Sequence, residues 1–310
     1  MKIFRINSTS SFIESGLNLA IGNFDGVHIG HQAVIKKLVQ ESKKINSHSA
    51  ILSFMPHPRQ YFTNNYDDFN IIDENEKIDL FKNLKIDYYI SLKFDSILAS
   101  LSPEKFIQDI LVNKLKVNNI TVGYDFKFGK DRKGNTDLLK KMASKYNYKV
   151  SIINQIKSKK DDSIYSSSLI RKKIEDGDFK GVSLMLGRNW SIKGKVVHGD
   201  KRASKINFPT ANIIPTKLIK PKKGVYAIKA RYLNNFYNGI ANFGIRPTIE
   251  GKKLLLEAHL FEFNQNIYSK DLTVEFLTFI RGEKKFNDFA SLSKQIQKDI
   301  QIVKKYHLEK

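Results

Sequence analysis

A chain of 310 residues is long enough to bury two hydrophobic cores, and an apolar fraction of 41% fits a globular protein. The absence of cysteine excludes disulfides, thiol catalysis and zinc–thiolate sites. Neither a signal-peptide core nor a run of membrane length is present, so we expect a soluble, cytoplasmic protein that binds no membrane.

The 53 basic and 31 acidic residues give a net charge of +22, which would suit nucleic acid or small anionic ligands. Only nine of the basic residues are arginines, and the lysines are scattered. No basic stripe interleaved with aromatic residues stands out, so we interpret the charge as a solvated lysine-rich surface and expect no nucleic-acid partner.

Short apolar runs alternate with helical patterns in the first half of the chain. The runs lie at residues 17–21, 50–54, 88–92, 120–122 and 150–153, and the helical patterns at about 32–44, 74–84, 103–115 and 137–146. This alternation predicts a parallel sheet with helices on both faces. Ligands in such folds bind at the carboxyl ends of the strands, beside helix N-termini.

The pattern changes in the second half. Residues 166–188 read as two short helices, and the chain then becomes β-rich, with runs at 196–197, 225–232, 237–243, 254–263 and 272–279. Runs of this kind joined by Gly, Asn and Pro turns predict an antiparallel barrel, which an amphipathic helix at 288–306 would close. We therefore predict two domains, 1–187 and 188–310.

The segment 21–31 carries the first motif, at the end of the first clear strand and the start of a helix. Its histidines, His28 and His31, lie where unpaired helix N–H groups favour an anion. The glycines at positions 22, 26 and 30 let the backbone approach a ligand closely. We expect a nucleotide phosphate here and charge stabilisation of nucleotidyl transfer. The alternative is a pair of surface histidines after a turn.

Three further segments follow predicted strands or begin a helix. His57 lies in the rigid 56–58 turn and could face the nucleotide, or it is an incidental residue of that turn. The loop 123–135 alternates glycine, aromatic and basic residues that suit a planar ring and phosphate, the alternative being a surface loop. Ser167 and Arg171 would form a second phosphate corner, although local sequence alone favours a plain serine N-cap.

The β-rich half contains oxygen ligands and a candidate base. Thr210 and Asn212 are two residues apart, so on an extended strand they face the same way, and their oxygens suit Mg²⁺. Glu257 is a strand carboxylate that could act as general base on a substrate hydroxyl. Taken singly, each of these features is also explained as a turn, a strand edge or a surface ion pair.

Taken together, these motifs resemble the prokaryotic bifunctional riboflavin kinase/FMN adenylyltransferase family, also called FAD synthetase. The matching segments are GxFDGxHxGH at 22–31, PHP at 56–58, GxDFxFG at 123–129, SSxxIR at 166–171, PTAN at 209–212, GVYA at 224–227, NxGxRPT at 242–248 and the glutamate at 257. The resemblance implies a Rossmann-like α/β nucleotidyltransferase-like domain followed by a flavokinase β-barrel.

The family implies two reactions, riboflavin plus ATP to FMN, and FMN plus ATP to FAD with pyrophosphate released. By resemblance, Glu257 takes the proton from the ribityl 5′-hydroxyl, Thr210 and Asn212 hold Mg²⁺, and His28 and His31 stabilise the adenylyl transition state. The implied ATP or phosphate contacts are Gly22, Phe24, Gly26, Gly30, Ser167 and Arg171. The implied flavin contacts are His57, Asp125, Phe126, Phe128, Asn242 and Arg246.

Some positions depart from the family pattern. Ala203, Asn207 and Ser269 stand where glycine is usual, and Met55 stands where an acidic residue is usual. If a position needs a positive φ, Asn tolerates it and Ala does so poorly. One alternative is therefore that only one activity is efficient, for example with a kinase weakened by the changes at Ala203 and Asn207. A second alternative, which the net charge motivates, is a basic nucleic-acid-binding protein on the same fold.

Overall fold

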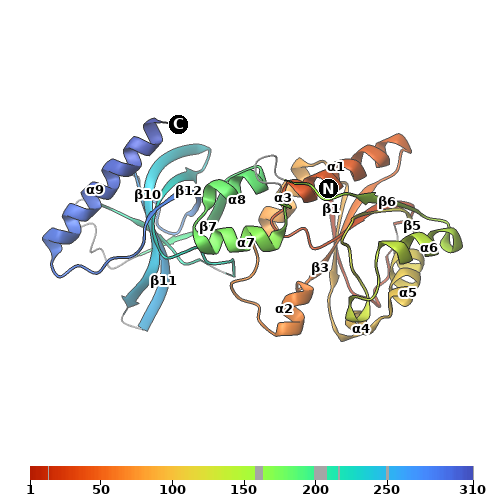
Figure 1. Cartoon of the computed structure of the whole chain (residues 1–310). Helices are drawn as coiled ribbons and strands as arrows, with labels where there is room; N and C mark the ends of the chain where they lie inside the picture. The colour runs from red at the N-terminus through yellow and green to blue at the C-terminus, as the bar shows by residue number, and fades with distance from the viewer. Residues whose placement is uncertain (13, 158–162, 199–207, 216, 249–250, 310) are drawn as a thin grey trace. The chain divides into compact units, whose positions relative to one another are not determined.

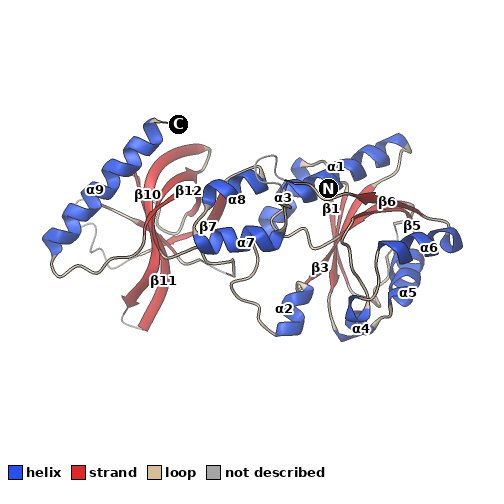
Figure 2. Ribbon diagram, viewed as in Figure 1, coloured by secondary structure: helices blue, strands red, loops and turns tan. Residues whose placement is uncertain are grey.

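The computed structural model describes residues 1–12, 14–157, 163–198, 208–215, 217–248 and 251–309. The chain divides into two compact units, Met1–Ser167 and Ser168–Lys310. Helices and strands alternate in the first unit, whereas the second is rich in strands (Figures 1 and 2). Within the described residues, no helix is both long and apolar enough to span a bilayer.

The first unit contains a six-stranded sheet in the order β1-β4-β3-β2-β5-β6, and every pair is parallel. The strands are β1 (Lys2–Ile6), β2 (Leu17–Ile21), β3 (Ser49–Met55), β4 (Tyr88–Lys93), β5 (Val117–Gly123) and β6 (Lys149–Ile153). The predicted parallel α/β domain is therefore confirmed. The strand β1, which sequence periodicity did not predict, extends the sheet beside β4.

The helical segments of this unit connect its strands. They are α1 (Ile29–Lys44), α2 (Pro58–Thr63), α3 (Glu74–Asn83), α4 (Ser96–Ser100), α5 (Pro103–Lys105), the π-helical η1 (Phe106–Lys114), the short η2 (Lys130–Arg132) and α6 (Thr136–Tyr146). The predicted helix at 103–115 begins with Ser102 as N-cap and Pro103 in the first turn, then widens into π-helical turns.

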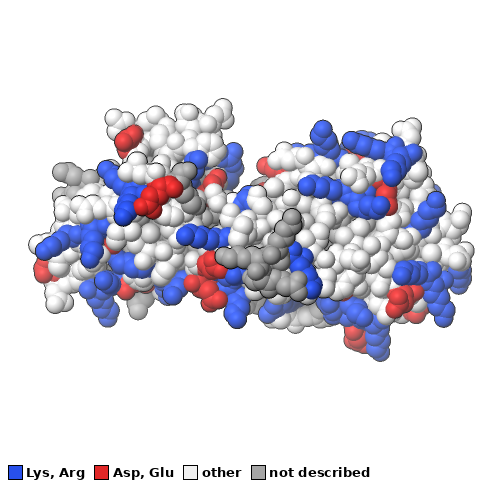
Figure 3. Space-filling view, turned by 45° about the horizontal axis from the view of Figure 1, so that its top comes forward, with Lys and Arg blue, Asp and Glu red and all other residues white. Residues whose placement is uncertain are grey.

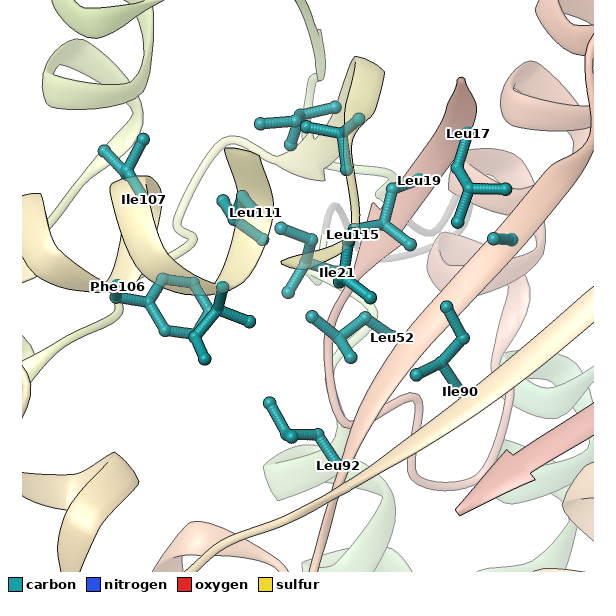
Figure 4. Close-up of a cluster of buried hydrophobic side chains, with 14 of the residues drawn as sticks. Leu17, Leu19, Ile21, Leu52, Ile90, Leu92, Phe106, Ile107, Leu111 and Leu115 are labelled. Atoms are coloured by element: carbon teal, nitrogen blue, oxygen red, sulfur yellow. The ribbon is translucent and has the colours of Figure 1, made fainter. Parts of the chain in front are cut away.

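The strand β2 is buried on both faces, which is why all five of its residues are solvent-inaccessible. Leu17, Leu19 and Ile21 point to one face and pack in the core cluster with side chains of η1, such as Phe106 and Leu111 (Figure 4). On the opposite face, the Asn18 amide donates to the Ser42 hydroxyl of α1 at 3.1 Å. Helices thus cover both sides of the sheet centre.

The chain reverses its direction of winding at β2. From β2 it proceeds to β3 and β4 on one side of the sheet, and then returns to place β5 and β6 on the other side. In open parallel sheets the carboxyl end of the strand at such a switch point is the usual ligand site. The loop after Ile21 begins at this point.

The second unit is a closed antiparallel barrel in the order β10-β11-β8-β7-β12-β9, which confirms the predicted barrel and closing helix. Its elements are α7 (Ser167–Asp176), α8 (Phe179–Leu186), β7 (Trp190–Val197), β8 (Ala211–Ile213), β9 (Gly224–Tyr232), β10 (Asn235–Thr248), β11 (Gly251–Leu260), β12 (Asp271–Arg281) and α9 (Phe289–Leu308). The helix α7 starts one residue before the unit boundary.

Aromatic packing explains why α8 belongs to this unit. Phe179 of α8 stacks on Phe276 at 4.9 Å between ring centroids and on Trp190 at 5.6 Å, and all three rings are buried. The compact units therefore divide at Ser167/Ser168. The boundary between two functional modules need not coincide with the boundary between two compact units. The division at 187/188 therefore stays a prediction for the functional modules.

The helix α9 lies against the outer face of the barrel (Figure 2). Val303 packs against Val225, Ala227 and Ile240. At the end of β12 the Arg281 guanidinium forms three hydrogen bonds to the buried Asp299 carboxylate, at 3.1, 3.0 and 2.6 Å. Both partners of this pair are largely removed from water, so it fixes the helix at one position on the barrel.

Basic side chains are spread over the face shown in Figure 3, with acidic and uncharged residues between them. This face shows no continuous basic stripe, in agreement with the scatter of lysines along the chain. A dispersed charge of this kind is a solvated surface rather than a groove that tracks a nucleic-acid backbone.

Candidate active sites

The loop from Gly22 to His28 forms the first candidate site. His28 is the N-cap of α1, with extended backbone angles, and its Nδ1 accepts a hydrogen bond from the His31 N–H at 3.3 Å. The helix begins at Ile29, three residues earlier than predicted, so both histidines lie at its N-terminus. The N–H groups and partial positive charge of that terminus favour an anion there.

The two imidazoles stack, with ring centroids 3.6 Å apart and an interplanar angle of 23°. His28 is only 5% exposed, and burial lowers its pKa to about 4. The ring is therefore neutral near pH 7. Because Nδ1 accepts a hydrogen bond, the proton of the neutral ring is on Nε2, which makes Nε2–H a hydrogen-bond donor.

The stacking explains why position 30 is glycine. A Cβ at Gly30 would lie 2.9 Å from Cε1 and 3.1 Å from Nδ1 of His28, so a larger residue would displace the ring. A Cβ at Gly22 would lie 3.2 Å from the Phe24 ring, which is also tight. Both glycines permit close packing beside the helix N-terminus.

The backbone of this loop is strained. Phe24 and Val27 have φ values of +48° and +41°, and Gly26 has +81°. Side chains with a Cβ rarely adopt positive φ, and a β-branched residue such as Val27 is an outlier there. Strain of this kind persists only where the surroundings fix the backbone, and it gathers at binding and catalytic loops.

Hydrogen bonds from distant segments fix the loop. The Ile71 N–H donates to both carboxylate oxygens of Asp25, at 3.0 and 3.2 Å, and Asp25 is 3% exposed. The Ser167 hydroxyl donates to the Asp25 carbonyl at 2.9 Å. The structure therefore brings Ser167 to the histidine loop, although its hydroxyl proton is already engaged in this hydrogen bond.

Lys77 is a residue of this site that sequence reasoning missed. Its ammonium donates to the Asn23 carbonyl at 3.0 Å, and the residue is 8% exposed. The signal was available in the helix pattern, because Lys77 shares the buried face of α3 with Ile78 and Phe81. A lysine on the apolar face of a predicted helix needs a partner in the interior.

Other predicted residues of this half occupy separate positions. His57 is the N-cap of α2, its Nδ1 accepts from the Arg59 N–H at 3.1 Å, and its ring lies 4.8 Å from that of Phe69. Arg171 is a buried residue of α7, in the second unit. The contacts of His57 with flavin and of Arg171 with ATP stay predictions.

The loop 123–135 does not present all of its aromatic residues at the surface. Phe128 is 6% exposed, and its ring packs against Phe106 at 5.5 Å and Phe126 at 5.4 Å. The loop closes on itself here, since Phe128 and Gly134 exchange backbone hydrogen bonds of 3.2 and 2.9 Å. Phe126 is half-buried and Asp125 is exposed, and flavin contacts by all three residues stay predictions.

The second candidate site lies on the barrel, where the register of three strands brings its residues together. Glu257 of β11 is the Cα partner of Asn242 on β10 and of Asn212 on β8, so the three residues form one row on one face. The Asn242 amide donates to Oε2 of Glu257 at 3.1 Å. Residues separated by 15 and 45 positions in sequence thus meet around one carboxylate.

The segment before β8 is held beside this row. Thr210 precedes the strand, so only Asn212 of the predicted pair lies in it, and the Asn212 amide lies 3.4 Å from the Thr210 carbonyl. His259 Nδ1 lies 2.8 Å from the Pro209 carbonyl. The first contact lies within the 209–212 segment, and the second joins that segment to β11.

The remaining predicted positions are only partly described. Arg246 pairs with Lys253 in the β10–β11 ladder, and its side chain lies outside the described part of the structure, as do Ala203 and Asn207. Ser269 has a φ of +63°. The position therefore requires the left-handed conformation that glycine adopts most easily, as its departure from the family pattern suggested.

Comparisons with known proteins agree across both units. The FAD synthetase family matches residues 11–168, and the riboflavin kinase family matches residues 186–307. A bifunctional riboflavin kinase/FMN adenylyltransferase of Haemophilus influenzae is 39% identical over 308 residues, 99% of each chain. The protein of that name from Buchnera aphidicola (subsp. Schizaphis graminum) is 40% identical, again over 99% of each chain.

A more distant relative of the same name, from Bacillus subtilis, is 36% identical over 93% of this chain and 92% of its own. Among solved structures, one titled a macrolide-efflux protein from Streptococcus pneumoniae superposes with a TM-score of 0.87 at 27% identity. It covers 97% of this chain and 98% of its own, so the two share their fold from end to end.

Proposed function

The chain belongs to the bifunctional riboflavin kinase/FMN adenylyltransferase family, and from this membership we propose that it makes FMN from riboflavin and FAD from FMN, with ATP as co-substrate of both reactions. The observation that carries the proposal is that both families match, one to residues 11–168 and the other to residues 186–307. Residues 1–187 are the proposed adenylyltransferase module and residues 188–310 the kinase module.

In the kinase module, Glu257 removes the proton of the ribityl 5′-hydroxyl. The 5′-oxygen forms a bond to the γ-phosphorus of ATP, the bond from that phosphorus to the bridging oxygen breaks, and ADP leaves. The hydrogen bond from Asn242 at 3.1 Å holds the Glu257 carboxylate in one orientation. Asn242 and Arg246 are the proposed flavin contacts of this module.

In the adenylyltransferase module, an oxygen of the FMN phosphate attacks the α-phosphorus of ATP, and pyrophosphate leaves. The nucleophile is already an anion, so no base is required. His28 donates from Nε2–H, and together with His31 and the N–H groups of α1 it stabilises charge on the phosphates. Positioning and charge stabilisation suffice for such a transfer.

We propose that the backbone of the loop surrounds the ATP phosphates at Gly22, Phe24, Gly26 and Gly30. Arg171 is the proposed further cation that binds ATP. Ser167 supports this loop through its hydrogen bond to the Asp25 carbonyl. The proposed flavin contacts of this module are His57, Asp125, Phe126 and Phe128. For the buried Phe128, the structure favours support of the Phe126 ring over direct contact.

The donor set of the barrel site fits Mg²⁺, since Thr210 and Asn212 supply hydroxyl and amide oxygens. Within the described residues, no group of three or more His, Asp or Glu side chains could hold a metal. Mg²⁺ would therefore be shared with the phosphates of ATP, where it neutralises their charge. We also propose a cytoplasmic location, because neither reaction needs an oxidising compartment and the chain has no cysteine to pair.

The proposal is tested by incubating the protein with ATP, Mg²⁺ and either riboflavin or FMN, followed by chromatography of the flavins. We expect FMN and then FAD from riboflavin, and FAD from FMN. A chain that makes FMN but no FAD, or FAD but no FMN, would retain one activity only. Salt-sensitive binding to nucleic acid without either flavin product would contradict both assignments.

A further inference from the structure

Lys77 is a buried cation directly behind the histidine loop. The residue is 8% exposed, and its ammonium donates to the Asn23 carbonyl at 3.0 Å. Burial lowers its pKa, while the nearby carboxylates of Asp25 and Glu74 oppose that shift. A lysine is rarely kept in such surroundings unless its charge and hydrogen bonds are used.

The backbone that Lys77 contacts is the strained part of the loop. Phe24, the next residue after Asn23, has a φ of +48°, and Val27 follows at +41°. Two other tethers of the loop, from Ile71 and Ser167, end on Asp25. The Ser53 hydroxyl also donates to the Asn23 carbonyl, at 3.5 Å, so the 3.0 Å hydrogen bond from Lys77 is the shorter of the two that hold the Asn23–Phe24 peptide.

Peptide geometry gives the direction of this effect. In a trans peptide the C=O and the following N–H point in opposite directions. With the Asn23 carbonyl directed to the ammonium, the N–H of Phe24 points away from Lys77. In the described part of the chain, no hydrogen bond joins this N–H to another residue. The N–H is thus oriented by Lys77 and keeps its hydrogen-bonding capacity for a ligand, although Phe24 as a whole is only 2% exposed.

We propose that Lys77 is a positioning residue for adenylyl transfer, which holds the Asn23–Phe24 peptide so that the Phe24 N–H is presented to a phosphate oxygen of the nucleotide. The inference rests on the proposed FMN adenylyltransferase activity. Lys77 itself contacts the loop backbone and does not need to touch the substrate. Its removal therefore affects the geometry of the transition state more than the affinity for FMN.

The test compares Lys77→Met, which removes the donor, with Lys77→Gln, which keeps a shorter uncharged donor, and Lys77→Arg, which keeps charge and donor. We expect the kcat of FAD formation to fall at least tenfold in Lys77→Met and at least threefold in Lys77→Gln. Lys77→Arg should recover most of the loss. The KM for FMN should stay within threefold of the wild type throughout.

Lys82→Met is the matched control, because Lys82 lies on the same helix with its side chain exposed, and it should leave FAD formation unchanged. Wild-type FAD formation tests the proposed function separately, before any variant is compared. A folded Lys77→Met protein with wild-type kcat would overturn the inference. If that variant does not fold, Lys77→Gln decides, since wild-type kcat in it would also overturn the inference.

Discussion

In the α/β unit, one turn between Ile21 and His31 supplies most of the candidate site, whereas in the barrel the site residues come from three different strands. The turn is shaped by positive φ values, glycines and buried tethers. The barrel row depends on the pairing of β10, β11 and β8. The site in the turn is therefore sensitive to a change in the backbone conformation of a single residue. The site on the barrel is sensitive to the register of its strands and to substitution of residues that are paired across them.

The largest expected effect separates the two sites by chemistry. Glu257→Gln keeps the size of the side chain but removes the proposed base, so phosphorylation of riboflavin should fall by about 10²–10⁴-fold. FAD formation from supplied FMN should be unchanged, because Glu257 is not part of the proposed adenylyltransferase site. Chromatography of both products checks the prediction, and equal loss of both activities in a folded protein would contradict the two-site assignment.

The next effect tests whether the turn depends on its glycine. In Gly30→Ala the new Cβ would lie 2.9 Å from Cε1 of His28, so the ring must move. A displacement on the order of 1 Å at a catalytic group costs roughly 10²-fold in rate, which is the loss of FAD formation we expect. Gly282→Ala is the control, since a Cβ there meets nothing within 4 Å. FMN formation should stay normal in both variants.

The buried imidazole should also give a pH-dependent stability. His28 has a folded pKa of about 4 against an unfolded value of 6.5, so between these values the unfolded chain binds a proton that the folded chain does not. The free energy of unfolding therefore falls as pH decreases from 6.5 towards 4, by on the order of 3 kcal/mol from this group. Denaturant unfolding of the wild type and of His28→Gln at several pH values measures the difference. An equal pH dependence in both proteins would show that His28 is not held neutral.

The smallest effect concerns the barrel. Ser269 has a φ of +63°, so Ser269→Gly relieves left-handed strain and should raise the free energy of unfolding by about 0.5 kcal/mol, after the greater chain entropy of glycine is subtracted. Ser269→Ala keeps the Cβ and should show no gain. Guanidinium unfolding of the three proteins distinguishes these outcomes, and a gain in Ser269→Ala would show that strain is not the cause.

Sequence periodicity predicted the parallel sheet, the barrel and the closing helix, because burial on one or two faces leaves a pattern along the chain. It placed His28 and His31 at a helix start for the same reason, since strand, glycine turn and helix follow one another directly. It did not show the row of Asn212, Asn242 and Glu257, because register is set by partners distant in sequence. Only the resemblance to a family brought these residues together.

Burial was the second property that local sequence did not reveal. The resemblance made Phe128 a flavin contact in a basic loop, yet its ring is buried and packs against Phe106 and Phe126. Composition does not distinguish Lys77 from the many surface lysines, and only its place on the apolar face of α3 signals that it supports the histidine loop from the interior. In a chain with a net charge of +22, composition conceals the few cations that are not on the surface.

The pairing of β11 has a consequence for how this chain can change in length. Side chains alternate between the two faces of a strand, so deletion of one residue within β11 before Glu257 would turn this carboxylate to the other face and place an apolar neighbour in the row. Such a deletion would abolish kinase chemistry even in a barrel that still closes. Insertions at the β9–β10 turn, where Leu233 is 73% exposed, leave this alternation intact. Chain-length variation compatible with the kinase is thus confined to turns outside the paired segments.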